Sequence, residues 1–221
     1  MTTAAVPIAL LALLLLPAQD PEEPPVDSKD LTLGKDKKKR YFLIGPQKDA
    51  KAPKNGYKLA IVLPGGDGGA EFHPFIRRVW REALGTEYLL VQPVSVKWNP
   101  NQVIVWPTRE NPVPGMKYAT EEFVEALIAE VSKQHKVNPR HVFTLSWSSG
   151  GPAAYSISLK EKQVTGSFIS QSVFHEATLP PLKNAKGHAY YLHHSPEDKT
   201  CPIDLARKAR DEFRRKNGGG H

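Results

Sequence analysis

Three serines lie close together in the middle of the chain, in Ser146-Trp147-Ser148-Ser149-Gly150. They follow the apolar run 141–145 and precede a segment with helical spacing, so they occupy a strand-to-helix junction. A serine at such a sharp turn can act as a nucleophile, because the turn exposes its hydroxyl and small neighbours let the backbone bend. Gly150 and the small Ser146 favour Ser148 in this role. Nucleophilic Ser146 or Ser149, and a purely structural turn, are the alternatives.

A second feature is the glycine-rich segment "IVLPGGDGG", residues 61–69, which also follows an apolar strand. An acyl-transfer enzyme needs N–H donors that face the oxyanion of its tetrahedral intermediate. Glycine lets backbone N–H groups approach a ligand closely. The predicted donors are the N–H groups of Gly66 and Ser149. A phosphate-binding loop is not supported, because the G-x-x-x-x-G-K-[ST] pattern is absent.

The third feature is an acid in "HHSPEDKTCPID", residues 193–204, where a strand ends and a helix begins. Asp198 is the predicted acid that holds a catalytic histidine in its tautomer and stabilises the imidazolium. Glu197 is the less favoured candidate, and a structural turn residue is the alternative for Asp198. Cys201 follows the acid rather than a turn after a strand, so cysteine hydrolase chemistry is not supported.

Strand-like and helix-like patterns alternate along the chain, which predicts an α/β fold with a mostly parallel twisted sheet and helices on both faces. Thr120 is expected to cap the second helix. Segment 96–115, rich in Pro and Asn, is expected to be a long irregular excursion. The expected strands are 41–45, 57–64, 87–95, 141–146, 165–174 and 188–194, and the expected helices are 71–84, 120–134, 150–159 and 202–216.

The N-terminus carries the apolar run 6–18, which is too short to span a bilayer comfortably and fits a secretory signal. The preceding "MTTAA" lacks the usual Lys or Arg, and an uncleaved anchor is the alternative. We predict a signal peptide at 1–18, a Pro-rich and basic linker at 19–40, and a hydrolase-like domain at 41–221. The protein is then secreted or periplasmic, with no stable membrane span after cleavage. The single Cys201 cannot form an internal disulfide.

The formal net charge is +7, and five of the positive charges lie in "KDKKKR", residues 35–40. This run is interpreted as a solvated segment, because no aromatic residues alternate with it as in a nucleic-acid groove. The sequence predicts no nucleic-acid partner, no metal and no cofactor. It leaves the oligomeric state open.

Together, "LPGGDGG", "NPRHVFTLSWSSGG" and "SPEDKTCPI" resemble the phospholipase/carboxylesterase and polyhydroxybutyrate-depolymerase-like esterases of the α/β-hydrolase superfamily, especially secreted bacterial members. The resemblance extends from Lys58 to the C-terminus. Pro64 stands where the family usually has the His of "LHG". The resemblance implies an α/β-hydrolase fold, a Ser-Asp-His triad and hydrolysis of a small-molecule ester without a metal or an organic cofactor.

The general base is the weak point of this hypothesis. In the family, the catalytic histidine follows a last strand, after the helix that succeeds the acid. Only 23 positions separate Asp198 from His221, and a helix takes up most of them. We therefore expect the domain to lack its last strand and helix, with the base beyond His221; a working His221 is the alternative. Neither the pocket candidates His73, His175, His193 and His194 nor the distant His135 and His141 are predicted to be the base.

The sequence thus predicts a serine hydrolase, a carboxylesterase, whose 221-residue form is nearly inactive. A serine peptidase of prolyl-oligopeptidase type and a non-catalytic binding module of the same fold are the alternatives. Among the aromatic residues, Trp80 is expected in the core, and Trp147 is a candidate wall of the acyl pocket. Trp98 and Trp106 are expected either to fold over the site or to pack on the surface.

Overall fold

The computed structural model describes residues 26–45 and 50–216. Its centre is a seven-stranded sheet with the order β1-β2-β4-β3-β5-β6-β7. The strands are β1 (Ser28–Thr32), β2 (Arg40–Ile44), β3 (Tyr57–Leu63), β4 (Tyr88–Pro93), β5 (Val137–Trp147), β6 (Gly166–Ser170) and β7 (Ala189–His193). The helices are α1 (His73–Val79), α2 (Thr120–Gln134), α3 (Gly151–Lys160) and α4 (Ile203–Lys216). Shorter helical turns are η3 (Ala70–Phe72), η4 (Trp80–Leu84), η5 (Ser148–Gly150), η6 (Glu176–Thr178) and η7 (Leu182–Ala185).

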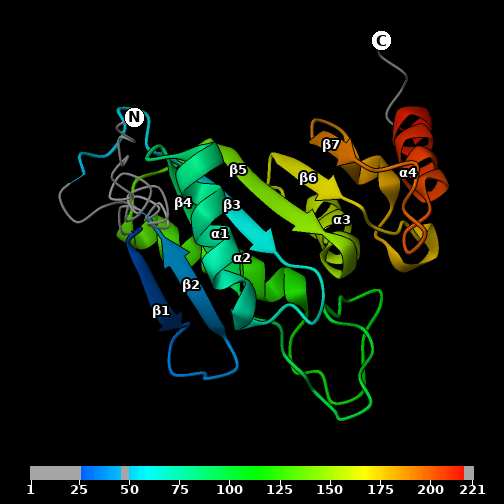
Figure 1. Cartoon of the computed structure of the whole chain (residues 1–221), viewed down its shortest axis with the longest axis horizontal. Coiled ribbons are helices and arrows are strands. Elements are labelled where there is room, and N and C mark those ends of the chain that lie inside the picture. Colours follow the sequence, from blue (N-terminus) through cyan, green and yellow to red (C-terminus); the bar gives the residue numbers. More distant parts are fainter. Residues whose placement is uncertain (1–25, 46–49, 217–221) are drawn as a thin grey trace, which may run out of the picture.

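The five neighbouring strands β4, β3, β5, β6 and β7 run parallel to one another. β1 pairs with β2, and β2 with β4, in antiparallel fashion. Figure 1 shows helices on both faces of this sheet and β1 at the edge opposite β7. The predicted architecture, a mostly parallel sheet with helices on both faces, is confirmed. Because parallel strands end at one edge of the sheet, the segments that follow β3, β5, β6 and β7 meet at that edge.

The alternation of side chains along β3 divides the core into two layers. Leu59, Ile61 and Leu63 face the helices α2, α3 and α4, while Ala60 and Val62 face α1. All five side chains are buried, as expected for a strand covered on both faces. This two-sided burial makes β3 a rigid support for the glycine-rich segment that follows it.

The predicted domain boundary at Tyr41 lies too late in the chain. Residues 28–32, inside the expected linker, form strand β1 and pair with β2. Its sequence, SKDLT, is mostly polar and exposed, so it lacks the apolar alternation that indicates a strand. Edge strands tolerate such charge, and here Asp30 pairs with Arg40 at 2.7 Å. The expected signal at 1–18 and linker residues 19–25 lie outside the described residues.

One local prediction about the helices is also wrong. Thr120 does not cap α2, because its hydroxyl donates to the Pro107 carbonyl at 2.7 Å and Ala119 precedes the helix. Phe75 in α1 is 44% exposed, although the neighbouring Ile76 is buried. Trp80 is buried, as predicted. Within residues 26–45 and 50–216, no helix is long and apolar enough to cross a membrane.

Candidate active site

The bend after β5 gives Ser148 an unusual backbone conformation. Ser148 has φ 50°, and among the described non-glycine residues only Gln171, with φ 45°, shares a positive φ. An L-residue at positive φ is strained, because its Cβ crowds the neighbouring carbonyl. Strained residues persist where the surrounding structure holds them, often at functional sites. The predicted strand-to-helix turn at Ser148 is therefore present, with α3 starting three residues later.

The residues after Ser148 must be small, because backbone and side chains crowd them. A methyl group built on Gly150 would lie 2.1 Å from the Leu63 carbonyl oxygen. One built on Gly151 would lie 2.0 Å from the Ser172 hydroxyl. Two positions before Ser148, Ser146 is fully buried, and its hydroxyl donates to the Phe168 carbonyl at 3.3 Å. A serine is accommodated there because its hydroxyl finds an acceptor.

Hydrogen bonds fix the glycine loop, residues 64–69, at each of its carbonyl oxygens. The Gly65 carbonyl accepts from the Gly68 N–H at 3.0 Å, and the Gly68 carbonyl accepts from the Ser95 N–H at 3.0 Å. The other donors are the Trp106 indole to Pro64, the Ser149 hydroxyl to Gly66, the Ser95 hydroxyl to Asp67 and the Gln92 amide to Gly69. The Gly68 N–H is used in this way, and the Gly69 N–H donates to the Asp67 carboxylate at 3.0 Å. The Gly66 N–H is left for another acceptor.

Gly66 and Ser149, the two predicted oxyanion donors, are linked directly. The Ser149 hydroxyl donates to the Gly66 carbonyl at 2.8 Å, which joins the bend after β5 to the glycine loop. The Gly66 N–H has no hydrogen-bond partner among the described residues. Gly66 has φ 59°, which glycine adopts without strain. This hydrogen bond places Gly66 beside the residue that follows Ser148, and the role of Gly66 and Ser149 as donors stays a prediction.

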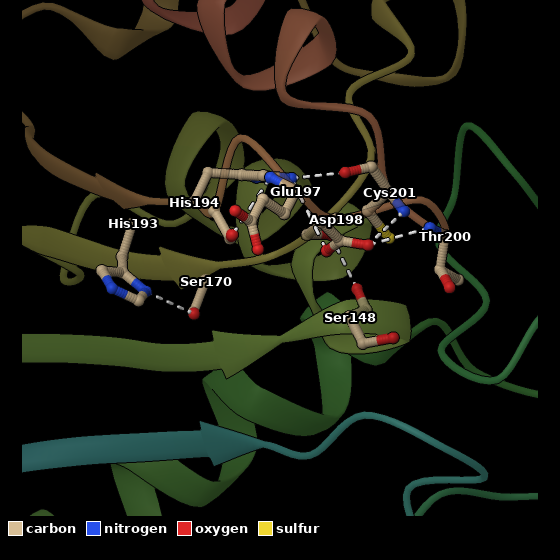
Figure 2. Close-up of polar contacts among 10 residues, drawn as sticks. Ser148, Ser170, His193, His194, Glu197, Asp198, Thr200 and Cys201 are labelled. Atoms are coloured by element: carbon tan, nitrogen blue, oxygen red, sulfur yellow. Dashed lines mark hydrogen bonds and ion pairs between the residues drawn. The ribbon is translucent and has the colours of Figure 1, made fainter.

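Asp198 lies near Ser148 (Figure 2). One of its carboxylate oxygens accepts the N–H groups of Thr200 and Cys201, each at 2.9 Å. The Cys201 N–H, then that of Thr200 and the nearby His194 hold the pKa of Asp198 below its usual value. A cavity of about 410 Å³ has Ser148 and Asp198 among its lining residues. The rest of its lining is Gln171, Ser195, Glu197, Thr200 and Cys201.

His194 is the histidine next to Asp198, but its ring is oriented away from the role of a base. Its Nε2 lies 3.7 Å from the second Asp198 oxygen and is hydrogen-bonded to the Cys201 carbonyl. A carbonyl only accepts, so Nε2 carries a proton and donates it. The side chain is 5% exposed, which holds it in this position. His194 therefore supports Asp198 and the turn at Cys201.

The remaining described histidines have other partners. His193 faces the opposite side of β7 and contacts Ser170 at 3.0 Å (Figure 2). His73 contacts Gln92 and Ser28 and stacks on Phe42. His135 and His141 contact aromatic rings, His188 contacts Ser167, and His175 precedes η6. None of these histidines is hydrogen-bonded to Ser148, and His221 lies outside the described residues. The described residues contain no cluster that could hold a metal ion.

Several residues that support the site were not found from the sequence. Ser172, which is buried, donates from its hydroxyl to the Ser148 carbonyl at 2.7 Å. Trp106, also buried, lies within contact of Gly68 and holds the Pro64 carbonyl. The irregular segment that contains Trp106 projects beyond the carboxyl ends of the central strands (Figure 1). Trp147 packs edge-on against Phe72 and Phe75, beside the glycine loop.

No protein-family model matches the sequence, and no curated protein matches it. The structure is similar to that of a thermostable esterase, with a TM-score of 0.62 and 17% identity over 88% of this chain and 52% of that chain. It also resembles a carboxylesterase from Mesorhizobium loti (TM-score 0.59, 18% identity, 86% of this chain and 85% of that chain). An α/β hydrolase enzyme from a Medee basin deep-sea metagenome library is similar as well (TM-score 0.57, 12% identity, 87% and 78%).

The chain has the α/β-hydrolase fold. It spans about half the length of the thermostable esterase. In an α/β-hydrolase sheet, ligands bind at the carboxyl ends of the strands. Ser148 after β5 and Asp198 after β7 lie at this edge.

Proposed function

We propose that this protein is a serine hydrolase that cleaves carboxylic esters, with Ser148 as its nucleophile. One observation carries the proposal: the strained Ser148 and the ionised Asp198 line one cavity at the carboxyl edge of the sheet. The glycine loop supports it, because its carbonyls are all occupied by donors. The esterases and hydrolases among similar structures support the same reaction class.

In the proposed reaction, a histidine takes the Ser148 proton while the serine oxygen bonds to the ester carbonyl carbon. The carbonyl electrons move to the oxygen, and the N–H groups of Gly66 and Ser149 stabilise the resulting charge. The intermediate then expels the alcohol, which receives the proton from the imidazolium. Water repeats the sequence on the acyl-enzyme and releases the acid. Asp198 orients the histidine and stabilises its charged form.

The described histidines do not supply this base, so we propose that it follows α4. α4 ends at Lys216, five residues before His221. We propose a histidine that follows His221 as the base, and a working His221 is the alternative.

The proposal is tested by p-nitrophenyl acetate hydrolysis with three proteins. They are the 221-residue chain, the longest natural gene product (the longest open reading frame that contains this chain) and the Ser148→Ala variant of that product. The longer product should hydrolyse the ester, and Ser148→Ala should reduce kcat by at least about 10³-fold. The 221-residue chain should be nearly inactive, and equal rates for the two lengths would refute the placement of the base. Hydrolysis that survives Ser148→Ala would refute the nucleophile.

A non-catalytic binding module is the second candidate, because no described histidine is hydrogen-bonded to Ser148. It predicts that no length of the chain hydrolyses the ester. It also predicts that a fluorophosphonate probe leaves Ser148 unlabelled in the longer product.

A further inference from the structure

The residues that line the Ser148 cavity are mostly polar. Apart from Ser148 and Asp198, they include Gln171 with its amide, Ser195 and Thr200 with their hydroxyls, and Glu197 with its carboxylate. Cys201 is the one weakly polar side chain in this lining. An alkyl group gains binding energy when apolar surface covers it, and this lining offers little.

Gln171 has an unusual backbone conformation for a residue of this cavity. Its φ is 45°, and Ser148 is the one other described non-glycine residue with a positive φ. Both residues line the same cavity. Its N–H donates to the His193 carbonyl at 2.9 Å, which extends the β6–β7 pairing by one residue. The next residue, Ser172, holds the Ser148 carbonyl, so the two strained residues are joined through one hydrogen bond.

The Gln171 side chain is free to bind a ligand. It is exposed, and its amide makes no hydrogen bond to another described residue. An amide both donates and accepts, so it can hold a hydroxyl group in either direction. Glycine would fit this backbone without strain, yet the chain holds a long polar side chain here at a cost in stability.

Ser148 and Asp198 both line the cavity, so the base that connects them enters it, and the leaving alcohol lies beside that base. The base that takes the serine proton returns it to the leaving alcohol, and Asp198 orients that base. Gly66 and Ser149, the proposed oxyanion donors, are not among the residues that line the cavity. The group that contacts Gln171 is thus the alcohol half of the ester.

We infer that Gln171 is a substrate-binding residue and that the site selects esters whose alcohol half carries hydroxyl groups, as in esters of glycerol or of sugars. The inference rests on the proposed function. Gln171 and Glu197 bind the hydroxyl groups of the alcohol half, and Ser195 and Thr200 line the same cavity. The lining carries two carboxylates and no Lys or Arg, so an alcohol that bears phosphate is disfavoured.

The test compares propyl acetate with 2,3-dihydroxypropyl acetate, which share a carbon skeleton and differ in two hydroxyls. For the longest natural gene product, kcat/KM is measured by pH-stat and divided by the rate of hydroxide-catalysed hydrolysis of each ester. The dihydroxy ester should be preferred about five- to tenfold, as expected for one or two net hydrogen bonds. 1-Acetylglycerol 3-phosphate should be a poorer substrate than the dihydroxy ester.

Variants assign the preference to the amide. Gln171→Gly should lower the preference to near one, whereas Gln171→Asn, which keeps an amide and tolerates positive φ, should retain part of it. Gln134→Ala, at an exposed glutamine that ends α2 away from the cavity, is the matched control and should keep the full preference. A ratio near one in the unaltered protein, or the same ratio in Gln171→Gly, would overturn the inference while ester hydrolysis itself stands.

A binding readout separates this inference from the proposed function. Ligand-observed NMR with the Ser148→Ala variant compares the Kd values of the two acetates without any turnover. Tighter binding of the dihydroxy ester that disappears when Gln171→Gly is added supports the inference even where hydrolysis fails. Equal binding of both esters to Ser148→Ala would overturn it.

Discussion

The strain at Ser148 predicts an inverted preference between glycine and alanine. At an ordinary helical position alanine is more stable than glycine by about 0.5–1 kcal/mol. At φ 50°, a residue with a Cβ is destabilised by about 1–2 kcal/mol, which glycine avoids. Combining the two values, we expect Ser148→Gly to be about 1 kcal/mol more stable than Ser148→Ala, although neither variant has a nucleophile.

Ala129, an exposed residue within α2, is the matched control, because Ala129→Gly should cost about 1 kcal/mol. The free energies of unfolding are compared by urea denaturation, followed by circular dichroism. A difference of 1 kcal/mol moves the midpoint of thermal unfolding by about 2–4 °C for a chain of this size. If Ser148→Ala proves as stable as Ser148→Gly, Ser148 is not strained and the argument for an exposed nucleophile at this bend is wrong.

Three further predictions concern the bend, the acid and a buried histidine. Gly150→Ala should destabilise the fold by about 1–3 kcal/mol and abolish hydrolysis, because the new methyl group meets the Leu63 carbonyl. Thermal unfolding measures the stability and an ester assay measures the hydrolysis. A stable, active variant would contradict the close approach of Gly150 to Leu63. The lowered pKa of Asp198 keeps its carboxylate ionised as the pH falls. The fall of kcat/KM at acid pH should therefore report protonation of the base histidine, near pH 6.5. A fall centred near pH 4 would contradict this assignment. Burial lowers the pKa of His188 to about 4, so its folded form binds a proton less readily than the unfolded chain. Its contribution to stability is complete above about pH 6.5 and is lost as the pH falls toward 4, by about 2 kcal/mol after allowance for partial exposure. His188→Gln should flatten the acid limb of stability measured by urea denaturation, and an unchanged limb would count against the buried neutral imidazole.

The sequence was sufficient to predict the sheet, because most of its strands are apolar runs bounded by Gly or Pro. It failed at β1, where a polar edge strand of five residues gains its stability from pairing with β2 rather than from its own pattern. Helical spacing identifies an apolar face but not how far the neighbouring surface covers it, and Phe75 in α1 is 44% exposed.

The residues of the candidate site could be predicted only where a local pattern marks them. Ser148 and Gly66 lie in short motifs, whereas Ser172 and Gln171 follow a strand far along the chain and meet Ser148 only through the β5–β6 pairing. Trp106 comes from an irregular segment with no fixed spacing to the loop that it holds. Such long-range contacts leave no trace in a single sequence.

The most direct test of the account is the identity of the residue that becomes covalently modified. The longest natural gene product is treated with a fluorophosphonate, digested and mapped by mass spectrometry. The account predicts one modified residue, Ser148, with loss of labelling in Ser148→Ala and at least partial loss in Asp198→Asn. Labelling at Ser146 or Ser149, or ester hydrolysis without any labelled serine, would contradict it.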